Sequence, residues 1–506
     1  MDSRKNYVVA VDVGSSEVVI AVGSMAEGGT VNIETVVAEP LTGVSAGLVE
    51  NSQTVAEALR RARVRAEQEV GVAITDAYVT ISGRFVRCAR YTDHVFVEDN
   101  ENRISQRDLA ALRERMLNVK AGAGEVIMDL FPLCYKSDIG TELQNPVGCY
   151  SKQLSSTYNF ILCEDTAKDR LRRVFLDVGI KIRSMFAGAS VMAKSLVTSD
   201  EKEDGVAIVD IGSGVTDLAI YRGGVLCYIA SIPMGGSALN NDILGYDNNI
   251  PSRMVENLKK QCGSAVVELT PDDMIQVRNR GRAIKPIPRL NLAAVIEARM
   301  TDIAEYVWNE IREAGYAKKL GAGIVLTGGG ANLKNVGELF HRITEQEVRV
   351  ACAEIGVATE ALEKYASPSY TMALSLLLHG AEVGPCPVGV LIQRSAEPKT
   401  EPKAEPVKPV EPVEPAQPAK PAQPKVTPQQ QVTPQPQPQP QPIQQPAEPN
   451  ALKGEDDNYG DDITDGDDDV KPGRGGWFRG WGGKIKRAFT EAFPEPGEDV
   501  DGDDEY

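Results

Sequence analysis

The chain has 506 residues, 42% of them hydrophobic, which is enough to bury the cores of several subdomains. A formal net charge of −18 and a pI near 4.9 argue against a general nucleic-acid binder, and eight scattered cysteines without CxxC spacing are expected to be reduced thiols. Because no signal-peptide layout is present and no apolar run approaches the roughly 20 residues that span a bilayer, any membrane contact is expected to be peripheral.

The first motif is VVAVDVGSSEVVIAVG, residues 8–23. It predicts an apolar strand, a tight turn around Asp12, Gly14, Ser15 and Ser16, and a second apolar strand. Such a turn can present backbone N–H groups and hydroxyls to phosphates, and its Asp can hold a Mg²⁺ that bridges phosphate oxygens, usually through water. One copy alone also describes an ordinary hairpin.

Helix-period segments follow at 54–70, 104–119 and 293–314, separated by short apolar runs. This alternation is typical of an α/β protein.

The second motif is VAIVDIGSGVTDLAIYRGG, residues 206–224, and it repeats the plan of the first. Its polar and glycine positions are Asp210, Gly212, Ser213, Gly214 and Thr216. Two copies about 200 residues apart indicate two similar half-domains that face one ligand.

Two further segments complete the set. A predicted strand enters Gly328, Gly329 and Gly330, where the backbone can approach a flat ligand such as adenine closely. Glu256 and Lys259, on a predicted helix after Pro251, share one helix face and could meet ribose hydroxyls, although the pair alone also describes a solvated salt bridge.

In order and spacing these motifs resemble the actin-type ATPase superfamily and, within it, the FtsA family of bacterial cell-division proteins. The similarity covers essentially residues 6–380. Beyond the nucleotide motifs it includes NPVGCYS (145–151), the connect-1-like GIKIRSMFAGASVMAKSLVT (179–198), VIEARMTDI (295–303) and SPSYTMALSLLLHG (367–380).

The resemblance implies a two-lobed actin-like ATPase fold with four subdomains. The expected boundaries are 1–84 and 161–198 for 1A, 85–160 for the inserted 1C, 199–233 and 320–390 for 2A, and 234–319 for 2B. After these subdomains we expect a linker at 391–474, an amphipathic helix at 475–493 and an acidic tail at 494–506.

The resemblance also implies that ATP and Mg²⁺ bind between the lobes, with Asp12 and Asp210 serving the metal. The phosphates are assigned to Gly14, Ser15, Ser16, Gly212, Gly214 and Thr216; Ser213 and Gly236 join the nucleotide set, Glu256 and Lys259 take the ribose, and Gly328, Gly329 and Gly330 take the adenine.

Three positions depart from the family pattern. Many relatives have Lys where Glu17 stands, and a carboxylate there would repel phosphates unless it points away. Ser213 replaces a glycine common in the second phosphate turn. The connect-1 segment after Gly188 offers Ser190 and no carboxylate to position water, so nucleotide binding with at most slow ATPase activity is expected, and no catalytic residue is assigned.

The C-terminal region has a different composition. Residues 398–449 hold 17 of the 31 prolines and predict a disordered spacer, either a tether or an inert tail. In 475–493, aromatic and apolar side chains share one helical face and bases the other, as in an interfacial helix on anionic lipid; docking in a protein groove is the alternative. The residues assigned to membrane binding are Trp477, Phe478, Trp481, Lys484, Ile485, Lys486, Arg487, Phe489 and Phe493.

The function implied is an ATP-binding division protein that polymerises and tethers the FtsZ ring to the cytoplasmic face of the inner membrane at the division site. Its partners would be itself, the FtsZ C-terminal peptide through 2B, with Arg299 as a candidate contact, later division proteins through 1C, and anionic lipid. For Arg299 the alternative is a pair with Glu297 or Asp302 on its own helix. The competing function is a sugar-type kinase of the same superfamily, which would need a carboxylate base near the sugar.

Overall fold

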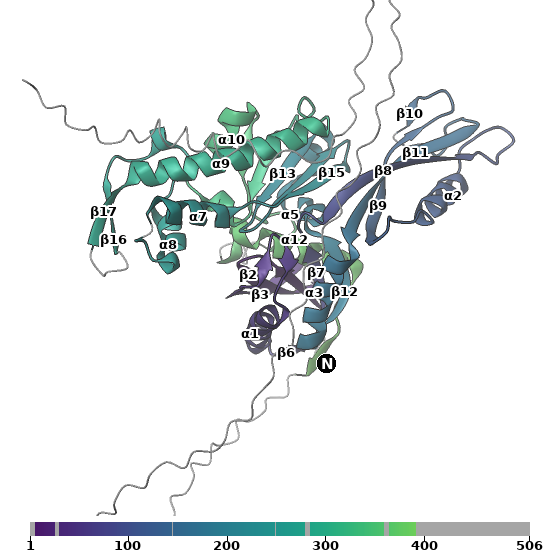
Figure 1. The fold of residues 1–506 in the computed structure, drawn as a ribbon. Coiled ribbons are helices and arrows are strands. Elements are labelled where there is room, and N and C mark those ends of the chain that lie inside the picture. Colours follow the sequence, from purple (N-terminus) through teal and green to yellow (C-terminus); the bar gives the residue numbers. More distant parts are fainter. Residues whose placement is uncertain are drawn as a thin grey trace, which may run out of the picture. The chain divides into compact units, whose positions relative to one another are not determined.

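The computed structural model describes residues 6–25, 30–143, 145–247, 249–278, 284–358 and 364–390. Two five-stranded sheets form the centre of this part of the chain (Figure 1). The first has the order β12-β7-β1-β2-β3 and consists of β1 (Tyr7–Val13), β2 (Glu17–Met25), β3 (Val31–Pro40), β7 (Asp76–Ile81) and β12 (Lys181–Ala187). The second has the order β15-β14-β13-β18-β19 and consists of β13 (Val206–Ile211), β14 (Thr216–Arg222), β15 (Val225–Ile232), β18 (Ile324–Thr327) and β19 (Val348–Val350).

The two sheets repeat one plan of strand pairing. In the first, β1 pairs antiparallel with β2 and parallel with β7; in the second, β13 pairs antiparallel with β14 and parallel with β18. The outer pairs match too, since β2 with β3 and β14 with β15 are antiparallel, whereas β7 with β12 and β18 with β19 are parallel. The prediction of two similar half-domains is therefore confirmed.

Helices cover the first sheet. The helices α1 (Ser52–Val70) and α12 (Thr371–Val383) both pack on its strands, and α3 (Asp165–Val178) packs on α1 and β12. The side chain of Asn51 caps α1 by accepting hydrogen bonds from the backbone of Gln53 and Thr54. The start of β1 reads as a continuous apolar run because Val8 to Val11 are wholly buried, as expected for a strand covered on both faces. We call this sheet with its helices lobe 1.

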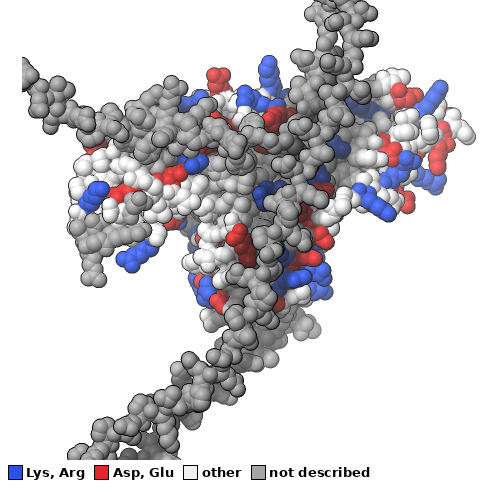
Figure 2. Space-filling model, viewed as in Figure 1, with Lys and Arg blue, Asp and Glu red and all other residues white. Residues whose placement is uncertain are grey.

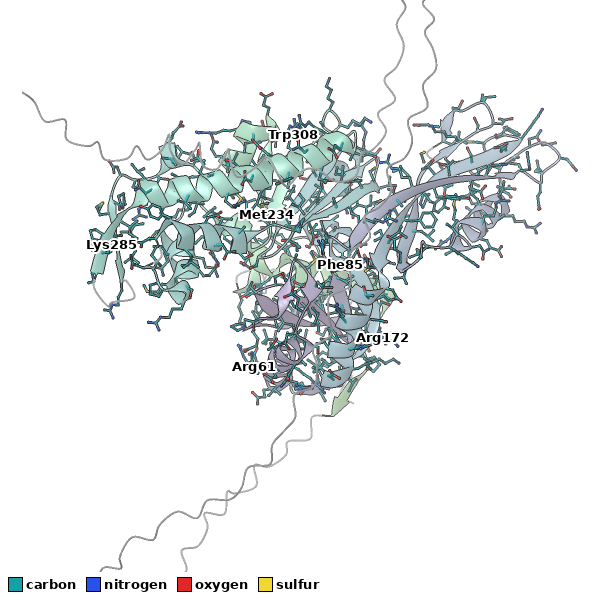
Figure 3. The ribbon with its side chains drawn as sticks, in the orientation of Figure 1. Arg61, Phe85, Arg172, Met234, Lys285 and Trp308 are labelled. Atoms are coloured by element: carbon teal, nitrogen blue, oxygen red, sulfur yellow. The ribbon has the colours of Figure 1, made fainter. Side chains whose placement is uncertain are left out.

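A four-stranded sheet with one helix is inserted between β7 and β12 of lobe 1. Its order is β10-β9-β11-β8, and its elements are β8 (Val86–Phe96), α2 (Gln106–Leu117), β9 (Glu125–Lys136), β10 (Glu142–Leu143) and β11 (Gln153–Glu164). It has a core of its own, with Leu112, Met116 and Leu154 fully buried. The insert leaves and rejoins the lobe at one place, where the Glu164 N–H donates to the Phe85 carbonyl at 3.1 Å. Figure 3 labels Phe85 there. The 1C boundaries proposed from the resemblance, 85–160, remain a prediction.

A second group of elements stands between β15 and β18. It consists of α7 (Gly236–Tyr246), α8 (Ser252–Cys262), η1 (Val267–Leu269), β16 (Met274–Arg278), β17 (Ile284–Pro288) and α9 (Arg289–Glu313). Along α9, Ile296, Met300 and Ile303 lie on the buried face at helical spacing. We call the second sheet with α7 to α10 lobe 2, where α10 (Val336–Thr344) packs on α9.

The predicted helical segments are confirmed, and the short elements complete the fold. The observed helices α1, α2 and α9 correspond to the segments predicted at 54–70, 104–119 and 293–314. The remaining elements are β4 (Val44–Ser45), β5 (Leu48–Val49), β6 (Val72–Ile74), α4 (Gly188–Val191), α5 (Ala193–Leu196), α6 (Ser199–Asp204), η2 (Gly329–Asn332), η3 (Pro368–Tyr370) and β20 (Val388–Val390).

The described surface mixes charges of both signs. On the face drawn in Figure 2, Lys and Arg side chains are interspersed with Asp and Glu among the coloured residues. All eight cysteines are free. Within the described ranges, no helix combines the length and the apolar character needed to cross a membrane. The linker, the amphipathic helix at 475–493 and its membrane-binding residues lie outside the described residues.

Candidate functional site

The two predicted phosphate turns lie against each other. In lobe 1 the Gly14 N–H donates to the Glu17 carbonyl at 3.0 Å, and in lobe 2 the Gly212 N–H donates to the Val215 carbonyl at 2.9 Å, so both turns close in the same way. A Cβ atom added to Gly214 would lie 2.3 Å from Ser15 Oγ. Gly214 therefore lets the turn of one lobe touch the turn of the other.

A cavity of about 830 Å³ opens where these turns meet. Every nucleotide residue predicted from the sequence lines it except Thr216. The predicted residues in its wall are Asp12, Gly14, Ser15, Ser16, Asp210, Gly212, Ser213, Gly214, Gly236, Glu256, Lys259, Gly328, Gly329 and Gly330. Fold alone brings them together, because they come from both lobes and from positions more than 300 residues apart.

Thr216 lies behind the second turn. Its side chain is fully buried, and its hydroxyl donates to the Met234 carbonyl at 2.9 Å. This bond ties the start of β14 to the segment that precedes α7. Thr216 therefore braces the turn, and its direct contact with phosphate remains a prediction.

The triple glycine approaches a strand of its own lobe. Gly328 has φ +83°, and a Cβ atom there would lie 2.0 Å from Asp210 Oδ1. At Gly330 the added atom would lie 2.4 Å from Ile211 Cγ2. The sequence predicted that these glycines serve a flat ligand; the structure shows that two of them are also required for packing against β13.

The predicted ribose pair forms a connected network on α8. Lys259 Nζ lies 2.8 Å from Glu256 Oε2 and donates to the Gly236 carbonyl at 3.0 Å. Asn240 of α7, which sequence reasoning missed, donates its amide N–H to the same Glu256 oxygen at 2.7 Å. Burial raises the pKa of Glu256, but the Lys259 and Asn240 hydrogen bonds outweigh it and hold that pKa below its usual value. Glu256 is therefore ionised and fixed in place.

Three carboxyl groups share the interior of the site. Burial, opposed by a 2.6 Å hydrogen bond from Thr80 and reinforced by Asp217, raises the pKa of Asp12 to about 6. Burial and the charges of Asp217 and Asp12 raise the pKa of Asp210 well above its usual value. Burial also raises the pKa of Asp217, although the Ser231 and Ser82 hydroxyls oppose the shift. A cation bound among these carboxyl groups would favour their ionised forms and oppose these shifts.

Asp217 is a site residue that sequence reasoning missed. It lines the cavity from β14, and its carboxylate accepts a hydrogen bond from the Ser231 hydroxyl. The available signal was an acid, directly after Thr216, inside an otherwise apolar strand. Because a buried carboxylate is costly without partners, such a residue is a candidate functional group.

The lining suits a phosphate-bearing ligand with its metal. Ser15 Oγ and Asn240 Oδ1 are buried and have no hydrogen-bond partner among the described residues. The glycines keep both turns tight: a Cβ at Gly212 would lie 2.9 Å from the Val215 carbonyl oxygen that closes its own turn. No group of three or more His, Cys, Asp or Glu side chains in the described ranges is placed to hold a metal ion. A Mg²⁺ at Asp12 and Asp210 would therefore need phosphate and water oxygens as further ligands.

The other predicted residues lie away from this network. Arg299 binds Asp242 of α7 through two nitrogens, at 2.6 and 3.1 Å, and Asp302 of its own helix at 3.0 Å. The Asp302 pair was anticipated as an alternative, whereas the Asp242 pair was missed. Ser190 donates its hydroxyl to the Ala187 carbonyl at 2.8 Å. An acidic partner peptide at Arg299 would compete with two carboxylates.

Known proteins resemble this chain in sequence and in fold. A model of the family described as "Cell division protein FtsA" matches residues 207–375. Cell division protein FtsA of Escherichia coli (strain K12) is 29% identical over 388 residues, which cover 75% of this chain and 91% of that protein. The FtsA of Bacillus subtilis (strain 168) is 28% identical over 354 residues, or 69% of this chain and 79% of the relative.

A solved structure supports the architecture. The PilM-PilN type IV pilus biogenesis complex contains a chain that superposes with a TM-score of 0.51 at 14% identity, covering 74% of this chain and 98% of that one. The likeness extends to the fold alone. The predicted α/β actin-like fold is confirmed, and so is the predicted resemblance: over most of its length the chain is similar to cell division protein FtsA.

Proposed function

We propose that this chain binds ATP with Mg²⁺ in the cavity between its lobes and works as an FtsA-type cell-division protein. The observation that carries the proposal is the meeting of two matching phosphate turns, the Gly328–Gly330 turn and the Glu256–Lys259 pair around one cavity. Sequence similarity to proteins named cell division protein FtsA supports the cellular role. It gives no support to the sugar-type kinase.

Each wall of the cavity has a role in this proposal. The backbone N–H groups and hydroxyls of the two turns would bind the phosphates, with Ser15 Oγ gaining the partner it lacks. The fixed Glu256 carboxylate would accept from ribose hydroxyls, and the glycine turn would contact adenine. Mg²⁺ would neutralise charge shared by the phosphates and the carboxylates of Asp12 and Asp210.

We infer that turnover is slow. The Ser190 hydroxyl, which follows Gly188 in connect 1, already donates to the Ala187 carbonyl. Asp217 is a carboxylate in the cavity, but burial disfavours the ionised form that would accept a proton, and Ser231 occupies one of its oxygens. We expect a rate well below the ~10 s⁻¹ that is the median for enzymes. A single-turnover assay that gave ~10 s⁻¹ would favour the kinase alternative.

The proposed cellular role is to polymerise on the cytoplasmic face of the membrane and hold the FtsZ ring there. The partners are those implied by the FtsA resemblance: a second copy, the FtsZ tail peptide, later division proteins and anionic lipid. The test is co-sedimentation with anionic vesicles and FtsZ, with and without Mg·ATP, beside a screen for phosphoryl transfer to small molecules. FtsZ should pellet with vesicles only when this chain is present. Transfer to a sugar without vesicle binding would contradict the proposal.

A further inference from the structure

Glu17 is an acid placed where a phosphate-binding turn ends. Its backbone carbonyl closes the turn by accepting the Gly14 N–H, and the residue begins β2. The residue is partly buried and lines the cavity. Glu17 therefore belongs to the lobe 1 wall of the site and is not a distant surface acid.

Lys260 stands on the wall contributed by lobe 2. It belongs to α8, lines the same cavity, and its side chain is 66% exposed. Its neighbour Lys259 is 13% exposed and is held by two acceptors, whereas within the described residues Lys260 has one ion-pair partner, Glu256 Oε1 at 3.3 Å. Of the two lysines, Lys260 is the one with freedom to reach across the cavity.

The charges around Glu17 favour an attraction between its carboxylate and the Lys260 ammonium group. Burial raises the pKa of Glu17, Lys260 is the next largest influence and lowers it, and Asp12 and Glu256 raise it. Lys260 therefore acts on Glu17 from the opposite lobe as a counter-charge, against the repulsion of two carboxylates.

We propose that Glu17 and Lys260 form an opposed charge pair across the cavity that holds the two lobes together over a bound nucleotide and slows its release. The inference rests on the proposed nucleotide site. It gives Glu17 a role that a simple phosphate-repelling acid would not have. Because the pair is partly exposed, its effect is modest and weakens with salt.

The two roles of Glu17 predict opposite signs for one substitution. If Glu17 only repels phosphates, Glu17→Lys adds a cation beside them and slows release. If Glu17 attracts Lys260, Glu17→Lys places two cations in opposition and speeds release. We expect faster release, by about two- to fivefold at low salt, the range typical of exposed ion pairs.

The experiment measures the dissociation rate of a fluorescent ATP analogue with Mg²⁺ from the full-length chain by stopped flow. Four proteins form a cycle: wild type, Glu17→Lys, Lys260→Glu and the double charge swap. Lys260→Glu should speed release in the wild-type background and slow it in the Glu17→Lys background. A contribution of Lys260 to phosphate binding alone would give the same sign in both backgrounds, which overturns the proposal.

Two controls keep the outcomes separate. Lys318→Glu reverses the charge of an exposed residue outside the cavity lining. It changes the net charge by the same amount as Lys260→Glu and should leave the dissociation rate unchanged. If wild type does not bind the analogue at all, the proposed nucleotide function fails. If it binds and the sign change is absent, only the charge-pair proposal fails.

Discussion

Single carboxylates decide the electrostatics of the cavity. Asp12 enters from lobe 1, and Asp210 and Asp217 enter from lobe 2; burial raises the pKa of each one. Since each charge disfavours the others, the site without a cation resists full ionisation. Metal binding and ionisation are therefore expected to be coupled, with Mg·nucleotide affinity rising with pH.

The first prediction concerns Asp210. Replacing Asp210 with Ala should remove the metal-dependent part of nucleotide affinity and leave the fold intact, because the lost carboxylate is already strained by burial next to Asp217. Titration of ATP with Mg²⁺ and with EDTA measures this directly. Asp210→Asn is the matched isosteric variant and should behave alike. Unchanged Mg·ATP affinity in both would contradict the assignment of Asp210 to the metal.

The second prediction concerns Asp12 and pH. In the nucleotide-free protein the pKa of Asp12 is raised from 3.8 to about 6, so the folded state binds more protons than the unfolded chain between these values. The stability that Asp12 contributes is therefore present below about pH 4 and is lost as the pH rises through about 6, by at most about 3 kcal/mol. Thermal unfolding of wild type and Asp12→Asn across this pH range should show a smaller decrease in stability for the variant. Parallel curves of stability against pH for the two proteins would contradict the raised pKa of Asp12.

At the scale of elements, the site depends on a turn that only glycine can form. Gly328 ends β18 with φ +83°, and the turn that follows packs on Ile211 at the end of β13. The same element therefore positions the Asp210 side chain and supplies the predicted adenine-contacting backbone.

The third prediction separates two costs of a side chain at Gly328, the left-handed backbone and the steric clash of the added Cβ atom. Gly328→Ala should lower the free energy of unfolding by about 2–4 kcal/mol, since it combines an unfavourable φ with a Cβ 2.0 Å from Asp210 Oδ1. Gly71→Ala is the control, because Gly71 has φ +78° and nothing within 4 Å of the added atom. It should lose only about 1–2 kcal/mol, the cost of a left-handed backbone for an L residue. Equal losses in urea denaturation would show that the clash relaxes without cost.

For the whole molecule, the proposed membrane attachment depends on residues outside the described structure. The fourth prediction is that deleting 475–493 releases the protein from anionic vesicles without changing ATP binding. One helix should bind weakly, helped by about 1 kcal/mol per base near anionic lipid. Polymerisation would link many helices, so that each later attachment becomes effectively intramolecular.

Vesicle co-sedimentation tests this with full-length protein, the deletion and Trp481→Glu. Full binding by the deletion would contradict the proposed anchor. Binding of a non-polymerising variant as tight as that of filaments would contradict the role of assembly.

The amino-acid pattern was sufficient to predict which segments form the repeated strand–turn–strand units and where the long helices lie, and the family resemblance added which residues would meet at the site. Local pattern suffices for these because buried strands read as apolar runs, helices as periodic ones, and tight turns require glycine at fixed positions. Repetition of one motif was enough to predict two matching half-domains.

Which polar groups meet at the site and around it follows from the three-dimensional fold and not from local pattern. The Ser231 bond to Asp217, the Asn240 bond to Glu256 and the pairing of Arg299 with Asp242 each join two different elements of lobe 2. Glu17 and Lys260 come from different lobes to line one cavity. Hydrogen bonds and pKa shifts depend on distance and burial in three dimensions, whereas sequence spacing fixes only neighbours within one strand or helix.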